Sequence, residues 1–210
     1  MTPIEVATVR LLRTNPFFAS VLMQLSRHAD VSLPFFAAVR KAAGRVCLVY
    51  NPHRMAALSP DETIGVLEHE CLHIVFRHLN RRGDRSRTMT LGKTVVGVFN
   101  VACDLAINPL IDKALPPGVV LPEHFRLPRG RTAEQYYEAL LRILDQLPAS
   151  LPALAPDYEG GLVDDHEGWE PSEGQEPDPE ASEEFDESLK RIVEVATEAA
   201  RARGSLPGFL

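Results

Sequence analysis

The chain has 210 residues, 45% of them hydrophobic, and a net charge of −7, which suits one folded domain with or without an appendage and excludes a wholly disordered protein. Its apolar runs are far shorter than the roughly 20 residues of a membrane-spanning helix, and its first residues lack the features of a secretory signal, so we expect neither. Three cysteines, an odd number without a pairing motif, argue against a disulfide framework and favour the reducing cytoplasm.

The N-terminal residues predict two helices and a small sheet. Apolar side chains recur at helical spacing over residues 4–13 and 17–28, and Asn15-Pro16 separates the two runs. Two segments rich in β-branched and aromatic side chains follow at residues 31–39 and 45–50. We expect these two segments to pair as a small sheet or hairpin.

The next helix has a strong start signal. Ser59 is a capping residue, Pro60 suits the first helical position, and Glu62 occupies the capping-box position. We expect this helix to run to about Asn80, where Arg81-Arg82-Gly83 ends it. Three further helices are predicted over residues 94–112, 132–143 and 183–203, the first of them buried and the last with an apolar face that includes Phe185, Leu189, Ile192, Val193 and Ala196.

Five arginines follow the helix that starts at Pro60: Arg77, Arg81, Arg82, Arg85 and Arg87. They leave nucleic-acid binding open as a hypothesis. The acidic total charge disfavours it, and cations are also favoured at a solvated helix C-terminus. We therefore expect no nucleic-acid partner.

An acidic segment sets the sign of the net charge. Between Asp157 and Glu187 there are 14 acidic residues and no Lys or Arg, whereas the rest of the chain has 22 basic and 15 acidic residues. We expect an α+β, mostly helical fold with a core over residues 1–145, an acidic Pro/Gly-rich loop or lid over 146–182 and a C-terminal helix over 183–210 that packs on the core.

The chemistry lies in His69-Glu70-Cys71-Leu72-His73, an H-E-x-x-H motif inside the helix that Ser59 caps. Residues four apart lie on one face of a helix, so both imidazoles can bind a single Zn²⁺ at about 2.0–2.1 Å. Glu70 lies beside that face and can take a proton from a water that attacks a carbonyl. The pattern predicts a zinc peptidase site with His69 and His73 as ligands and Glu70 as general base. A surface helix that happens to carry these three residues is the alternative.

A third ligand is expected because catalytic zinc keeps three protein ligands and one open position. Asp104 is the favoured candidate, since a carboxylate in the apolar run 98–107 is costly to bury unless a cation or donors satisfy it. Pairing with an arginine or capping of a backbone group would satisfy it equally. Asn108, one turn later, would orient Asp104.

Two other histidines lie near the motif or near acidic groups. His78 follows His73 by five residues, about 140° further round the helix, and no glycine between them allows a break, so we expect a neighbour of a ligand rather than a ligand. His166, beside Asp164, Asp165 and Trp169, would reach the metal or the developing oxyanion if its loop folds over the site; a solvated linker is the alternative. Cys71 and Cys103 are expected to be core residues.

The combination of motifs resembles a bacterial family of zincin-like metallopeptidase domains. The resemblance covers most of the chain and is carried by these segments: Asn15-Pro16-Phe17-Phe18, Tyr50-Asn51-Pro52, His69-Glu70-Cys71-Leu72-His73 through His78 and Arg81, Ala102-Cys103-Asp104-Leu105-Ala106-Ile107-Asn108, Asp165-His166 with Trp169, and Gly204-Ser205-Leu206-Pro207-Gly208. In that family the zincin-like domain precedes a von Willebrand factor A-like domain and often accompanies a MoxR-type AAA+ ATPase. The second domain is absent here, so we expect either part of a longer protein or a lone module.

The resemblance implies zinc ligation by His69 and His73 and a catalytic role for Glu70, with Asp104 and His166 as further motif positions. We therefore expect a cytoplasmic metallopeptidase that binds one Zn²⁺ and acts on a peptide or protein. The alternative is a catalytically silent zinc-binding module that recognises a protein partner, such as an AAA+ ATPase. A closed four-ligand site would favour the module, because no position would remain for water.

Overall fold

In the computed structural model, residues 1–42, 44–81, 85–92, 94–146 and 179–210 are described. They fall into two units. The first unit comprises the described residues within Met1–Arg81, Lys113–Leu115 and Asp164–Leu210, and the second those within Arg82–Asp112 and Pro116–Val163. Helices dominate, with a three-stranded sheet and a separate two-stranded sheet, which confirms the predicted α+β, mostly helical class.

The first unit begins with two helices on either side of Asn15. Helix α1 (Pro3–Thr14) starts at a capping box in which the Thr2 side chain accepts from the Glu5 N–H and the Glu5 side chain accepts from the Thr2 N–H. Helix α2 (Pro16–Met23) is shorter than predicted, because Ser26–Ala29 forms strand β1 and gains its hydrogen bonds from another strand.

The small sheet has the order β1-β3-β2. Strands β2 (Ala37–Ala42) and β3 (Arg45–Tyr50) form the predicted antiparallel hairpin, and β1 adds to the other edge of β3 in parallel. The first predicted strand begins later than expected, because the buried side chain of Asn51 donates to the carbonyls of Val31 and Leu33 and holds that segment in a turn. Asn51 also caps the short helix α3 (Pro52–Ala56).

Helix α4 (Pro60–Val75) carries the H-E-x-x-H motif and starts at the predicted capping box of Ser59 and Glu62. It is buried on every side from Thr63 to Ile74, rather than on one face only. The helix ends at Val75, five residues earlier than predicted, and a 3₁₀ turn, η1 (His78–Asn80), follows.

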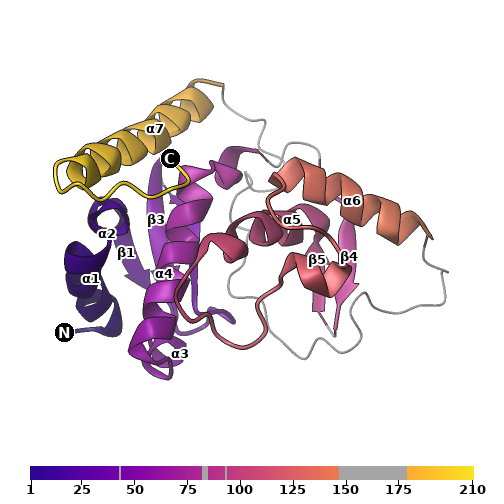
Figure 1. The fold of residues 1–210 in the computed structure, drawn as a ribbon, viewed down its shortest axis with the longest axis horizontal. Helices are drawn as coiled ribbons and strands as arrows, with labels where there is room; N and C mark the ends of the chain where they lie inside the picture. Colours follow the sequence, from indigo (N-terminus) through magenta and orange to yellow (C-terminus); the bar gives the residue numbers. More distant parts are fainter. Residues whose placement is uncertain (43, 82–84, 93, 147–178) are drawn as a thin grey trace. The chain divides into compact units, whose positions relative to one another are not determined.

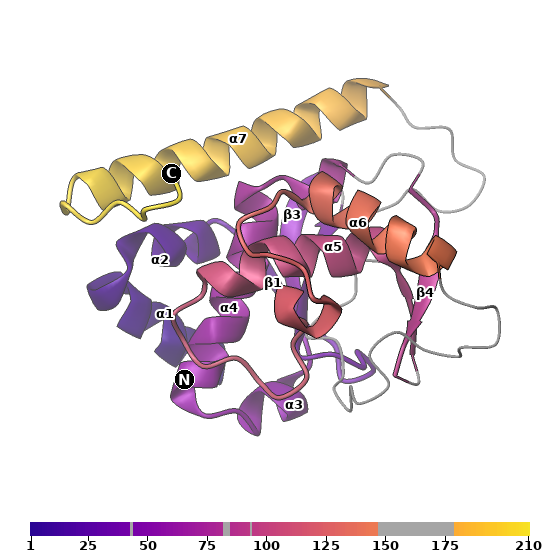
Figure 2. The same ribbon diagram turned by 45° about the vertical axis from the view of Figure 1, so that its right-hand side comes forward.

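Helix α7 (Pro179–Arg201) packs alongside α2 (Figures 1 and 2). Four of the five apolar side chains predicted for its inner face are buried, and Val193 is half-buried. The Gln24 side chain also donates to the carbonyl of Ile192, and the Lys41 ammonium lies over the Phe185 ring at 4.7 Å. The helix is therefore held by an apolar face with polar contacts around it.

The second unit starts with a hairpin of β4 (Thr88–Leu91) and β5 (Thr94–Gly97), followed by α5 (Val98–Ile107) and the 3₁₀ turn η2 (Asn108–Leu110). The predicted helix over 94–112 was therefore wrong at its start. β-branched residues there pair with β4, and Gly97 marks the change from strand to helix. Pro109, which cannot continue an α-helix, follows its end.

Helix α6 (Ala133–Gln146) packs against α5 over the core of this unit. Thr132 caps α6 and exchanges hydrogen bonds with Gln135: the Gln135 N–H donates to the Thr132 side chain, and the Thr132 N–H donates to the Gln135 side chain. The segment between α5 and α6 contains a short 3₁₀ helix, η3 (Pro122–Phe125). The core is made by these buried residues: Met89, Leu91, Val96, Val98, Val101, Ala102, Leu105, Val120, Phe125, Tyr136 and Leu140.

Among the described helices, none combines the length and the apolar character that crossing a bilayer requires. Cys47, Cys71 and Cys103 are buried free thiols.

Candidate metal centre

The two histidines of the motif lie with their side chains together on α4. Their Nε2 atoms are 3.0 Å apart, and the rings meet edge to face with centroids 4.6 Å apart. Both residues are fully buried, at 0% exposure. The four-residue spacing therefore does what the sequence predicts: two imidazole nitrogens from successive turns face one point.

This arrangement fits a metal ion. Two nitrogens bound to one tetrahedral ion at about 2.0–2.1 Å lie roughly 3.3 Å apart. The observed separation of His69 and His73 is within a few tenths of an ångström of that value. Neutral imidazole nitrogens are ligands suited to zinc and its neighbours among the transition metals.

Glu70 lies between the two histidines in sequence and is also fully buried. Its Oε2 accepts a 2.8 Å hydrogen bond from the backbone N–H of Val39 on strand β2, which packs against α4. A hydrogen bond from a backbone N–H to a carboxylate is strong, and the fixed backbone sets the direction of this oxygen. The sheet thus orients the predicted general base, a contact that joins residues 31 apart in the sequence and that its pattern did not predict.

His78 is placed differently from the sequence prediction, which had the helix continue past it. Arg77 adopts the left-handed conformation (φ 54°, ψ 36°), so the chain reverses after α4 without a glycine. His78 is then buried, with its Nδ1 3.0 Å from Nδ1 of His73. It contacts Nδ1 of His73, the ring nitrogen that does not face His69.

Asp104 belongs to the other unit, on α5. It is only 2% exposed and lies within an apolar helix, as predicted. His69, His73 and Asp104 are therefore all buried, and two imidazoles and a carboxylate are donor groups that zinc takes in proteins. Asn108, predicted to orient Asp104, donates from Nδ2 to the carbonyl of Val120 at 2.9 Å and so holds the loop after α5.

The cysteines beside the predicted ligands are core residues by their surroundings. Cys71 and Cys103 are both fully buried. Burial raises the pKa of the Cys71 thiol well above its ordinary value, and the nearby carboxylates of Glu68 and Glu70 raise it further. A thiol held protonated is a poor metal ligand.

His166 and its neighbours Asp164, Asp165 and Trp169 lie outside the described residues, as does most of the predicted acidic lid. The role of His166 at the metal or the oxyanion stays a prediction.

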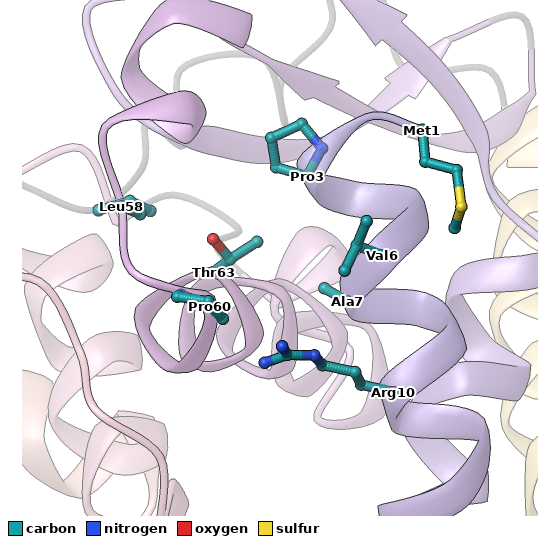
Figure 3. Close-up of a pocket in the computed structure, with 8 residues that line it drawn as sticks. All are labelled: Met1, Pro3, Val6, Ala7, Arg10, Leu58, Pro60 and Thr63. Atoms are coloured by element: carbon teal, nitrogen blue, oxygen red, sulfur yellow. The ribbon is translucent and has the colours of Figure 1, made fainter.

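A hollow of about 240 Å³ lies elsewhere in the first unit, between α1 and the start of α4 (Figure 3). It is lined by Met1, Pro3, Val6, Ala7, Arg10, Leu58, Pro60 and Thr63. Arg10 is its one charged side chain, and the lining offers no imidazole, carboxylate or thiol. The hollow therefore has no groups for acid–base or metal chemistry and is distinct from the histidine pair.

In the comparison with protein families, a family model described as a putative metallopeptidase domain matches residues 2–210, nearly the whole chain. Neither the curated proteins nor the solved structures contain a match.

Proposed function

The chain belongs to the putative metallopeptidase domain family, and we propose that it is a zinc-dependent enzyme that hydrolyses peptide bonds. The proposal rests above all on the buried Nε2 atoms of His69 and His73, which face each other at 3.0 Å on successive turns of one helix. Beside them lies Glu70, a carboxylate on the same helix.

In this proposal His69 and His73 hold one zinc ion through Nε2. Zinc in such a site lowers the pKa of a coordinated water towards 7 and polarises the substrate carbonyl. Glu70 accepts the proton of the attacking water through the carboxylate that the Val39 N–H orients, and then delivers it to the leaving amine.

Asp104 is the third ligand in this proposal. A carboxylate at 2% exposure within an apolar helix is stabilised when it neutralises a cation. A zinc ion held by three protein ligands would keep one position for water, as catalytic zinc sites do. His166 is the alternative third ligand, or a donor to the oxyanion of the tetrahedral intermediate.

The substrate is a peptide or protein, and the setting we propose is the cytoplasm, where three buried free thiols stay reduced. The family resemblance suggests an AAA+ ATPase or a von Willebrand factor A-like protein as a partner.

Metal content and peptidase activity on an unfolded protein, such as reduced casein, test the proposal together. We expect one zinc per chain, with Glu70→Gln retaining zinc and losing at least about 100-fold in activity, because removal of a general base typically costs 10²–10⁴-fold. Glu68→Gln is the matched control, since it makes the same change two residues earlier on a different side of α4. It should keep most of the activity.

Two outcomes would contradict the proposed peptidase activity. One is a zinc-loaded wild type that hydrolyses no peptide bond. That result would favour the catalytically silent zinc-binding module. The other is equal activity in wild type and Glu70→Gln.

A further inference from the structure

The turn after α4 brings a third imidazole to the histidine pair. Arg77, in the left-handed conformation, ends the helix, and the Asn80 N–H donates to its carbonyl at 3.1 Å to close the turn. A left-handed conformation in a residue other than glycine costs free energy, so the surrounding structure must hold it. The turn places His78 beside helix α4, against the side chain of His73.

The contact formed is specific in its atoms. Nδ1 of His78 lies 3.0 Å from Nδ1 of His73, while Nε2 of His73 faces His69. The His73 ring is thus approached at both nitrogens, one from within the motif and one from the turn.

Metal binding determines where the protons must be. A neutral imidazole that binds a metal through Nε2 carries its proton on Nδ1. His73 therefore donates from Nδ1, and Nδ1 of His78 must accept, which leaves the proton of His78 on Nε2. Ligating histidines are normally oriented by such a bond, most often to a carboxylate or a carbonyl. In this chain an imidazole occupies that place.

We propose that His78 is a positioning residue, which fixes the orientation and tautomer of His73 for metal binding. This inference rests on the proposed metal site, but it concerns binding rather than turnover.

The surroundings of His78 suit this role, because they fix its ring. The Phe76 ring stacks against the His78 ring, with the ring centroids 5.9 Å apart and an angle of 22° between the ring planes. Arg81 donates from Nη1 to the Phe76 carbonyl at 2.9 Å. Asp186 of α7 accepts from Arg77 at 3.4 Å and from Asn80 at 3.3 Å, so both sides of the turn are tied to a separate helix.

Two substitutions separate positioning from packing. His78→Phe keeps a ring that can stack on Phe76 but has no acceptor. His78→Asn loses the ring but places an amide oxygen where Nδ1 was, because both atoms are bonded to Cγ. We expect zinc affinity, measured by competition with a chromophoric chelator, to fall about 10–100-fold in His78→Phe and to stay within about threefold of wild type in His78→Asn.

The melting temperature of the metal-free proteins provides the structural control. A packing role predicts that His78→Asn is the more damaging change, for both stability and affinity. Equal zinc affinity in wild type and His78→Phe, or affinity as weak in His78→Asn as in His78→Phe, would overturn the positioning role.

A second measurement needs no substitution and so stands if a variant does not fold. Long-range ¹H–¹⁵N NMR of the zinc-loaded wild type should show the Nδ1–H tautomer for His73 and the Nε2–H tautomer for His78. Any other pair of tautomers contradicts the inference. A zinc-loaded protein without peptidase activity overturns the proposed function alone, whereas a wild type that binds no zinc overturns both.

Discussion

Gly65 and Ala114 meet so closely that no side chain fits between them: a Cβ on Gly65 would lie 2.2 Å from the carbonyl oxygen of Ala114. Gly65 is in the interior of α4, one turn before His69, where glycine is about 1 kcal/mol less favourable than alanine. Backbone contact with the segment Lys113–Leu115, part of the same unit, explains why glycine occupies this position.

Replacement of Gly65 by alanine should therefore destabilise the protein despite the better helix propensity of alanine. A backbone atom is the obstacle, so either the 113–115 segment or α4 must move, at a cost of about 1–3 kcal/mol. In a chain of this length that lowers the melting temperature by roughly 2–12 °C. Gly208→Ala is the matched control, because nothing lies within 4 Å of its added Cβ. A Gly65→Ala variant as stable as wild type would contradict the close contact.

Removal of the metal should destabilise the wild type. A ligand that binds only the folded state stabilises it by about 2.7 kcal/mol when its free concentration is 100 times its Kd. We expect thermal melting in a chelator to shift downward and to recover when zinc is restored in excess. For each of the variants His69→Ala and His73→Ala, the melting temperature in the chelator should equal the melting temperature in excess zinc. A zinc-dependent shift of equal size in these variants would place the metal elsewhere.

Asp104→Asn tests the third ligand. The substitution keeps the shape of the side chain but removes the charge that a cation would neutralise, so zinc affinity should fall by at least about tenfold if the carboxylate binds the metal. Asp112→Asn makes the same charge change at an exposed position and should leave affinity unaltered. If Asp104→Asn binds zinc as wild type does, the third ligand lies elsewhere, and His166→Ala becomes the informative variant.

The capping box of α4 should give a pH-dependent contribution to stability. Two hydrogen bonds lower the pKa of Glu62 below its ordinary value of 4.5: the larger effect comes from the Ser59 side chain and the smaller from the Ser59 backbone N–H. A lowered pKa in the folded state means that the contribution is complete above pH 4.5 and disappears as the pH falls through the lowered value.

Ser59→Ala should accordingly cost about 0.5–2 kcal/mol at pH 7, since one donor of the first turn loses its acceptor. The difference in melting temperature between wild type and this variant should shrink on acidification below pH 4.5, as Glu62 becomes protonated in both. A difference that stays constant or grows would show that the Ser59 side chain makes no pH-dependent contribution through the Glu62 carboxylate.

Much of the candidate metal site could be predicted from the sequence because it is local. The Ser59 cap, the four-residue spacing of His69 and His73 and the burial of Asp104 follow from patterns within single helices, which depend on hydrogen bonds and side chains a few residues apart. The antiparallel hairpin of β2 and β3 was predicted for the same reason.

Two of the errors fall where distant parts of the chain meet. Residues 26–28 were predicted to be helical but belong to strand β1, because the more distant strand β3 supplies its hydrogen bonds. Residues 94–97, also predicted to be helical, form strand β5 by pairing with the neighbouring strand β4. The early end of α4 depends on Arg77 in a conformation that its residue type disfavours, and contacts with α7, more than a hundred residues later, help to hold it there.

By itself the sequence determined which groups the candidate site contains: two imidazoles and a carboxylate at helical spacing, in a helix whose start is set by the capping residues 59–62. Only the tertiary structure decided how those groups are oriented, through the Val39 N–H at Glu70 and the His78 ring at His73. The physical reason is that spacing along a helix fixes which side chains share a face, whereas the direction of each hydrogen bond depends on a partner that folding brings from elsewhere in the chain.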